Sequence, residues 1–267
     1  MSDTETETIY PSASAEAQAR QMQQRCEASF RHVVSDLERA VGLPEGRPLR
    51  TVKSPFTGMD TLGVPQATLA DLDQAIVRAR AAGRRWGNAP AATRARFLYK
   101  LHDLLWEYSD EILDVIQWET GKSRYHAYDE IQDIALNCRY YARILSRAVR
   151  EERRRGAFPG VTRTFVMYEP KGVVGVIAPW NYPLSMGITD AIAALAAGNA
   201  IVTKPDSNTP LSVVIGKVLM MKAGLDPDLF ILVPGRGSEL ELHSSSRSTH
   251  DVYRFYCYRS SYCQAIG

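Results

Sequence analysis

Hydrophobic residues recur every three or four positions through most of the first half of the chain, which predicts α-helices. Thr68, followed three residues later by Asp71, has the pattern of a capping box at a helix start. Gly83 and Gly121 are expected to end their helices. The predicted helices cover residues 17–41, 68–83, 93–108, 110–119 and 123–147. We expect the last four of them to form one helical layer with short connections.

Shorter segments interrupt this helical half. Residues 50–53 and 60–65 flank a Pro-Phe-Thr-Gly turn and predict a β-hairpin. Residues 1–15, rich in Thr, Glu and Ser, are predicted to be disordered. In the run 151–155, two acidic residues precede three arginines. This order favours a solvated helix end over a nucleic-acid site.

The hydrophobic pattern changes after Lys171. Residues 172–178 (GVVGVIA) form a continuous apolar run, which is typical of a strand covered on both faces. Further strands are predicted at 200–204 and 230–233, with helices at 183–197 and 209–223 between them. This βαβαβ order is half of a doubly wound sheet, whose ligands bind beyond the carboxyl ends of the strands. Residues 179–181, 204–209 and 234–238 should therefore converge at one edge.

Composition narrows the function classes. The chain of 267 residues carries 32 basic and 30 acidic residues, a net charge of +2, which argues against a dedicated nucleic-acid binder. The sequence shows no apolar stretch long enough to span a bilayer and no signal peptide. Its four cysteines are too few and too scattered for a disulfide framework. We therefore expect a cytoplasmic protein, without a membrane or nucleic-acid partner, and predict no metal site.

Polar residues and glycines follow each predicted strand. Asn181 offers an amide that can stabilise an oxyanion, or it caps the following helix. Lys204 can reach a ribose or a phosphate, or its side chain can snorkel into solvent at the sheet edge. Gly235 and Gly237 permit close approach of a ligand to the backbone, or merely a tight turn.

Several strings, in this order and spacing, resemble the aldehyde dehydrogenase superfamily. They are SPFTGMDTLGVPQAT, WETGK, VVGVIAPWNYPL, TKPDSNTP and VPGRGSEL. Within the superfamily the sequence is most similar to succinate-semialdehyde dehydrogenase. The resemblance implies an α/β fold, in which an open, parallel, Rossmann-like cofactor-binding sheet follows an amino-terminal helical layer. It divides the chain into an amino-terminal extension (1–49), an incomplete cofactor-binding domain (50–240) and an aberrant tail (241–267).

The resemblance also implies roles for single residues. Asn181 matches the family's oxyanion donor, and Lys204 matches the lysine that binds the adenosine ribose. Ser207 lies where many NAD-preferring members carry a glutamate, so we expect NADP to be accepted at least as well as NAD. The implied cofactor-binding positions are Ala178, Pro179, Trp180, Lys204, Ser207, Gly235 and Gly237.

The catalytic residues of the family are not matched. Its cysteine nucleophile and its general-base glutamate lie further along the chain than this sequence extends. Cys257 and Cys263 lack the expected flanking residues, and Cys26 and Cys138 lie on apolar helix faces, as small core residues do. The resemblance therefore implies NAD(P)-dependent oxidation of an aldehyde in the lineage and no activity in this chain alone. The alternatives are a non-catalytic nucleotide-binding fragment and a non-functional truncated product.

The tail suggests its own explanation. When residues 251–260 are back-translated and the frame is shifted by one nucleotide, the codons admit Met-Phe-Thr-Gly-Ser-Thr-Ala-Thr-Gly-Arg. This string contains the family's next motif, Phe-Thr-Gly-Ser-x-x-x-Gly. Our hypothesis is that the tail is an out-of-frame reading of a longer gene, which resequencing of the coding DNA would test. By family likeness, residues 163–169 form an edge strand that joins a neighbouring subunit, so a homo-oligomer is expected for the full-length protein and is doubtful for the fragment.

Overall fold

An open parallel sheet lies at the centre of the molecule. The computed structural model describes residues 13–158, 160–235 and 253–257, the last five as backbone. β5 (Val173–Ile177), β6 (Ala200–Lys204) and β7 (Phe230–Leu232) pair in parallel, and the strand order is β7-β6-β5-β8. The predicted Rossmann-like sheet is confirmed, with each of the three predicted strands in its place.

A fourth strand comes from the tail, where the sequence sustains no helical or strand period over more than a few residues. β8 (Tyr253–Cys257) pairs in parallel with the free side of β5. Its sequence, YRFYC, is rich in aromatic residues, which favour extended backbone. Since β6 and β8 lie on opposite sides of β5, the strand order reverses at β5, and crevices at such reversals are where doubly wound sheets bind ligands.

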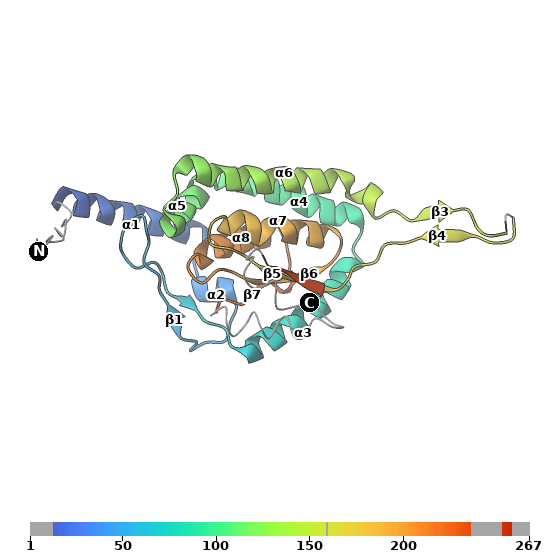
Figure 1. The fold of residues 1–267 in the computed structure, drawn as a ribbon, viewed down its shortest axis with the longest axis horizontal. Helices are drawn as coiled ribbons and strands as arrows, with labels where there is room; N and C mark the ends of the chain where they lie inside the picture. Colours follow the sequence, from blue (N-terminus) through green and yellow to red (C-terminus); the bar gives the residue numbers. More distant parts are fainter. Residues whose placement is uncertain (1–12, 159, 236–252, 258–267) are drawn as a thin grey trace, which may run out of the picture.

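Helices cover both faces of the sheet (Figure 1). α7 (Pro183–Ala196) and α8 (Pro210–Lys222) lie on one face, and α3 (Leu69–Gly87) lies on the other. A short 3-10 helix (Pro227–Leu229) leads into β7. The two crossover helices are apolar on nearly every side because they are buried between the sheet and a further helical layer.

That further layer consists of α4 (Ala91–Glu107), α5 (Ser109–Thr120) and α6 (Arg124–Ala148). It packs on α7 and α8 opposite the sheet, and it contains three of the four helices predicted to form one layer (Figure 1). Gly121 ends α5 with a φ of 70°, in the left-handed region that favours glycine. A Cβ atom at this position would also lie 3.2 Å from Cγ of Pro55, so a side chain there would push the proline ring aside.

Helix α3 differs from the prediction in the layer that it packs on and in the residue at which it ends. The capping box of Thr68 and Asp71 is confirmed, but the helix packs on the sheet and not in the helical layer. It also continues through Gly83 to Gly87. A Cβ atom at Gly83 would lie 3.2 Å from Cβ of Ala200, so this glycine allows close helix–strand packing and does not end the helix.

The amino-terminal helix is divided. α1 (Ala13–Val33) and α2 (Leu37–Val41) replace the single helix expected over 17–41, because Asp36 caps the second helix. The predicted hairpin is confirmed, with β1 (Leu49–Arg50) paired to β2 (Val64–Pro65). Helix α1 starts inside the segment that we expected to be disordered, and the rest of that segment lies outside the described residues.

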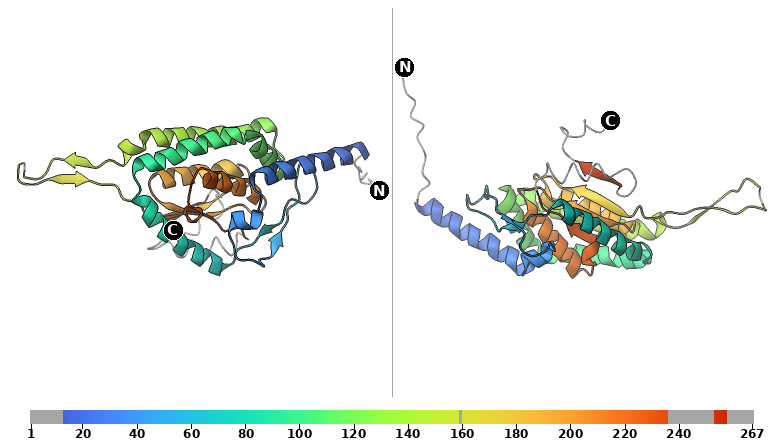
Figure 2. Two further views of the ribbon diagram at one scale, coloured as in Figure 1. Left: turned by 180° about the vertical axis from the view of Figure 1, so that it is seen from behind. Right: turned by 90° about the horizontal axis from the view of Figure 1, so that it is seen from below.

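A thin arm projects from the body (Figures 1 and 2). It is an antiparallel ribbon of β3 (Glu152–Arg154) and β4 (Thr164–Val166). The charged run at 151–155 therefore forms an edge strand, and our prediction of a helix end there was wrong. Helix α6 ends at Ala148, before this run, and residues 152–154 pair with the antiparallel strand β4. Among the described residues, no helix is long and apolar enough to cross a membrane.

Candidate functional site

The loop after β5 presents Trp180 and Asn181 at the sheet edge. Ala178 is buried, and its N–H donates to the Lys204 carbonyl at 3.0 Å, which extends the parallel ladder by one residue. Trp180 is 56% exposed and Asn181 is exposed as well. Asn181 does not cap α7, since the cap position is Tyr182 and makes no side-chain bond. The capping alternative for Asn181 is therefore wrong, and its amide is available to a ligand.

Lys204 ends the middle strand and lies directly opposite Ile177 in the register. Its side chain is only 4% exposed, and Nζ donates to the Pro205 carbonyl at 3.3 Å. The alternative of a lysine that snorkels into solvent is therefore wrong. A buried amine at a strand end is a hydrogen-bond donor suited to hydroxyl or phosphate oxygens of a ligand.

The third loop meets the second through Ser207. Its Oγ donates to the Gly235 carbonyl at 2.9 Å, and the preceding Pro234 carbonyl accepts from the N–H of Ala67 at 2.6 Å. The structure thus brings the loops after β6 and β7 together, as the parallel sheet predicts. Gly237 lies outside the described residues.

Two buried glutamates from the helical layer support these loops. Glu130 of α6 accepts the N–H groups of Leu184 and Ser185 at 2.9 and 3.0 Å, at the start of α7. Its other oxygen accepts from Lys122 Nζ at 2.6 Å. Lys122 Nζ also donates to the Asn181 carbonyl at 2.7 Å. The residue expected to hold an oxyanion is thus fixed through its own main chain.

Glu119 makes the matching contact with α8. Its carboxylate accepts the N–H groups of Leu211 and Ser212 at 2.7 and 2.6 Å and the Ser212 hydroxyl at 2.6 Å. Burial raises the pKa of Glu119 to about 8, although the three hydrogen bonds oppose this shift. Sequence reasoning missed both glutamates. The signal was present, because each carboxylate interrupts the apolar stripe of its helix.

The comparison with known families decides the lineage. The model of the aldehyde dehydrogenase family matches residues 44–251. This chain belongs to the aldehyde dehydrogenase family. The strand-end loops described above lie within the residues that the family model matches, and residues 236–238 of the third loop are outside the described part of the chain.

One relative of this chain is a Mycolicibacterium smegmatis protein that bears the name succinate-semialdehyde dehydrogenase (NADP+). It is 46% identical over 194 residues, which are 73% of this chain and 38% of the relative. A vanillin dehydrogenase of Corynebacterium glutamicum is 37% identical over 71% of this chain and 39% of its own length. This chain spans about two fifths of the length of these relatives.

Solved structures of the same family agree. Succinate-semialdehyde dehydrogenase from Burkholderia pseudomallei superposes with a TM-score of 0.72 at 30% identity, over 78% of this chain and 42% of that one. A NAD-dependent benzaldehyde dehydrogenase from Corynebacterium glutamicum gives 0.70 at 33% identity, over 75% and 44%. These matches confirm the fold and show that an aldehyde dehydrogenase of full length holds much more than this chain.

The two cysteines that the structure describes in full lie in the core, away from the strand-end loops. Cys26 and Cys138 are buried, and burial raises their thiol pKa to about 11 and about 12. Both are core residues, as their helix faces indicated. Cys257 is described only as backbone, at the end of β8, and Cys263 lies outside the described residues.

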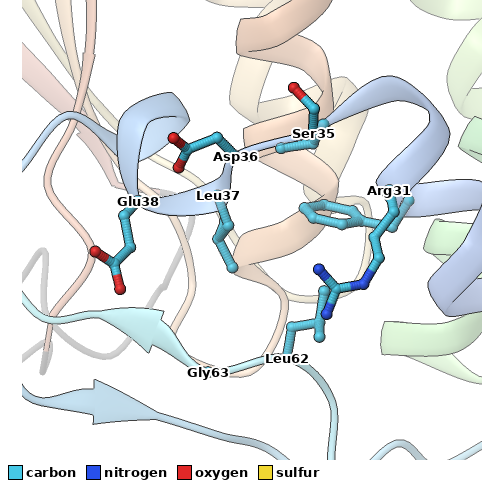
Figure 3. Close-up of a pocket in the computed structure, with 9 residues that line it drawn as sticks. Arg31, Ser35, Asp36, Leu37, Glu38, Leu62 and Gly63 are labelled. Atoms are coloured by element: carbon cyan, nitrogen blue, oxygen red, sulfur yellow. The ribbon is translucent and has the colours of Figure 1, made fainter.

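A surface cavity of about 410 Å³ lies away from this edge (Figure 3). It forms where α1 meets α2, opposite β2. Its wall consists of Phe30, Arg31, Val34, Ser35, Asp36, Leu37, Glu38, Leu62 and Gly63. None of the predicted cofactor-binding residues lines it. The cavity holds none of the predicted site residues, so we assign it no role in catalysis.

Proposed function

We propose that this chain supplies the cofactor-binding half of an NAD(P)-dependent aldehyde oxidation. The supporting observation is that two adjacent parallel strands carry Asn181, exposed, in the loop after one strand and Lys204, buried, at the end of the other. By family likeness, the Asn181 amide would donate a hydrogen bond to the aldehyde oxygen as negative charge develops on it. The bound nicotinamide would accept the hydride.

The described residues fit such a cofactor. Lys204 provides a donor for ribose hydroxyls, and the exposed face of Trp180 provides an apolar surface for a planar ring. We propose that Ala178, Pro179 and Gly235 offer main-chain contacts to the cofactor; Gly237, the remaining predicted position, lies outside the described residues. Thr209 adds a buried hydroxyl that has no hydrogen-bond partner within the described residues.

Ser207 carries our proposal that NADP is accepted at least as well as NAD. Its hydroxyl donates to Gly235 in this structure, so it must turn to donate to a 2′-phosphate. We expect Ser207→Glu to weaken NADP binding by roughly tenfold or more, because a carboxylate repels the phosphate, and to leave NAD binding within about threefold. Titrations of both nucleotides against both proteins measure this. Equal losses for NADP and NAD would contradict it.

The substrate, the compartment, the subunit contact and the domain division are further proposals. We propose succinate semialdehyde as the aldehyde, since several relatives bear that name. We propose a cytoplasmic protein without nucleic-acid or membrane partners, in which the β3–β4 arm joins a second subunit of the full-length homo-oligomer. Its exposed apolar residues, Phe165 and Met167 among them, fit such a contact. We further propose the division into an extension (1–49), an incomplete cofactor-binding domain (50–240) and an aberrant tail (241–267), whose β8 strand joins the sheet.

A binding experiment tests the proposal directly. The 267-residue chain is titrated with NADP by calorimetry and assayed with succinate semialdehyde under the same conditions. We expect saturable binding without turnover. Aldehyde oxidation would contradict the proposed absence of a nucleophile. A folded chain without binding would contradict the cofactor site and would favour a non-functional product.

A further inference from the structure

The junction of α5 and α6 contacts the loop after β5 and the first turn of α8. The segment Glu-Thr-Gly-Lys at 119–122 ends α5 and places two ionisable side chains three residues apart, before and after Gly121. Glu119 reaches the first turn of α8, which follows the loop of Lys204 and Ser207. Lys122 reaches the carbonyl of Asn181. One short segment is therefore bonded to the chain on either side of the cofactor edge.

The contacts on the Asn181 side form a closed network. Lys122 Nζ donates to Asn181 O and to Glu130 Oε1, and it lies 4.2 Å from the ring centroid of Tyr182. Glu130, which is fully buried, accepts from the first amides of α7 with its second oxygen. The cation thus binds the loop before α7, and its carboxylate partner binds the helix itself.

This arrangement constrains the main chain and leaves the Asn181 side chain exposed. The Lys122 bond is charge-assisted, and its partner Glu130 lies in a region without competing water. A ligand-binding amide that is held in place before the ligand arrives saves the entropy of ordering the loop. Without the lysine, the exposed loop of Trp180 and Asn181 would sample more conformations.

We propose that Lys122, together with Glu119 and Glu130, is a positioning element that sets both cofactor loops from the helical layer. The inference rests on the proposed function, since it assigns these residues to binding NADP and to orienting Asn181. They touch neither cofactor nor substrate in this role. Their effect passes through the Asn181 carbonyl in the β5–α7 loop and through the first amides of α7 and α8.

The test compares four variants of the 267-residue chain. Lys122→Met alone leaves the buried Glu130 charge unpaired, which endangers folding, so the double variant Lys122→Met/Glu130→Gln is measured beside it. Lys122→Arg keeps a cation that can reach the same acceptors. Lys100→Met removes an exposed lysine of α4 and serves as the matched control.

NADP affinity and hydrogen exchange are the two measurements. We expect the double variant to bind NADP about tenfold more weakly, Lys122→Arg to recover to within about threefold, and Lys100→Met to be unchanged. Peptides over 179–185 should exchange faster in the double variant than in the parent, at unchanged secondary structure. Unchanged affinity and unchanged exchange in a folded double variant would overturn the proposal.

The two proposals fail differently. If the parent chain binds no NADP, the cofactor site is refuted for this chain. The positioning element is then tested only by comparing hydrogen exchange over 179–185 between the parent and the double variant. Faster exchange then supports it, and equal exchange overturns it. If the parent binds NADP and the variants bind equally well, the proposed function stands and the positioning element falls.

Discussion

Replacing Glu119 with alanine should lower the free energy of unfolding by about 3 kcal/mol. The substitution removes the acceptor of three hydrogen bonds at the start of α8 and leaves two buried N–H groups unpaired. Each unpaired buried donor costs about 1–3 kcal/mol, and the cavity adds to this. Urea unfolding followed by circular dichroism measures the change. Glu107→Ala, at an exposed position of α4, is the control and should change stability by less than about 0.5 kcal/mol.

The same residue gives stability a pH dependence. Burial raises the pKa of Glu119 from an ordinary 4.5 to about 8 in the folded chain, so folding takes up a proton between these values. Its stabilising effect is therefore complete below about pH 4.5 and is lost as the pH rises towards 8. Glu119→Gln cannot ionise, so the stability difference between parent and variant should shrink from pH 5 to pH 8. A difference that grows with pH would contradict this.

The sheet was predictable because parallel strands buried on both faces consist of continuous apolar runs. Val173–Ile177 and Ala200–Lys204 each carry this pattern, and glycines and prolines separate them from the helices. The position of α3 was not predictable from its own pattern. An amphipathic stripe shows that a helix buries one face, and it does not show which layer covers that face. The helix end predicted at Gly83 was wrong for a related reason, since close packing and helix termination both favour glycine.

The strand-end residues of the candidate site could be predicted from topology, because the carboxyl ends of parallel strands share one edge. The residues that hold these loops and the following helices in place could not be predicted. Glu119, Lys122 and Glu130 act across sequence separations of about 50 to 90 residues, on backbone groups that carry no sequence signature. A charged residue inside an apolar stripe indicates a buried partner, but the partner is fixed only by the packing of α5 and α6 against α7 and α8.

A second residue of this kind, Arg94 of α4, carries our other large prediction. Its guanidinium is 5% exposed, and Nε donates to the Ala196 carbonyl at 2.9 Å. Nη1 donates to the carbonyls of Ala89, Gly87 and Trp86 at 2.6, 3.2 and 3.4 Å. Within the described part of the chain, no carboxylate pairs with it. Arg94 thus joins the carboxyl ends of α3 and α7, where carbonyls are unpaired and the helix dipole favours a cation.

Arg94→Met should therefore cost about 3–5 kcal/mol of unfolding free energy, because it removes the donor to the buried Ala196 carbonyl and to the partly buried carbonyls of Gly87 and Ala89. Arg94→Lys should recover only part of this loss, since one ammonium cannot span the fork. Gly198 makes repacking difficult. It has a φ of 95°, and a Cβ there would lie 3.0 Å from Cα of Gly87. Arg96→Met, on the exposed face of the same helix, is the matched control. If both methionine variants unfold at the same urea concentration, Arg94 does not join the two helix ends, and the approach of α3 to α7 must be held by apolar packing alone.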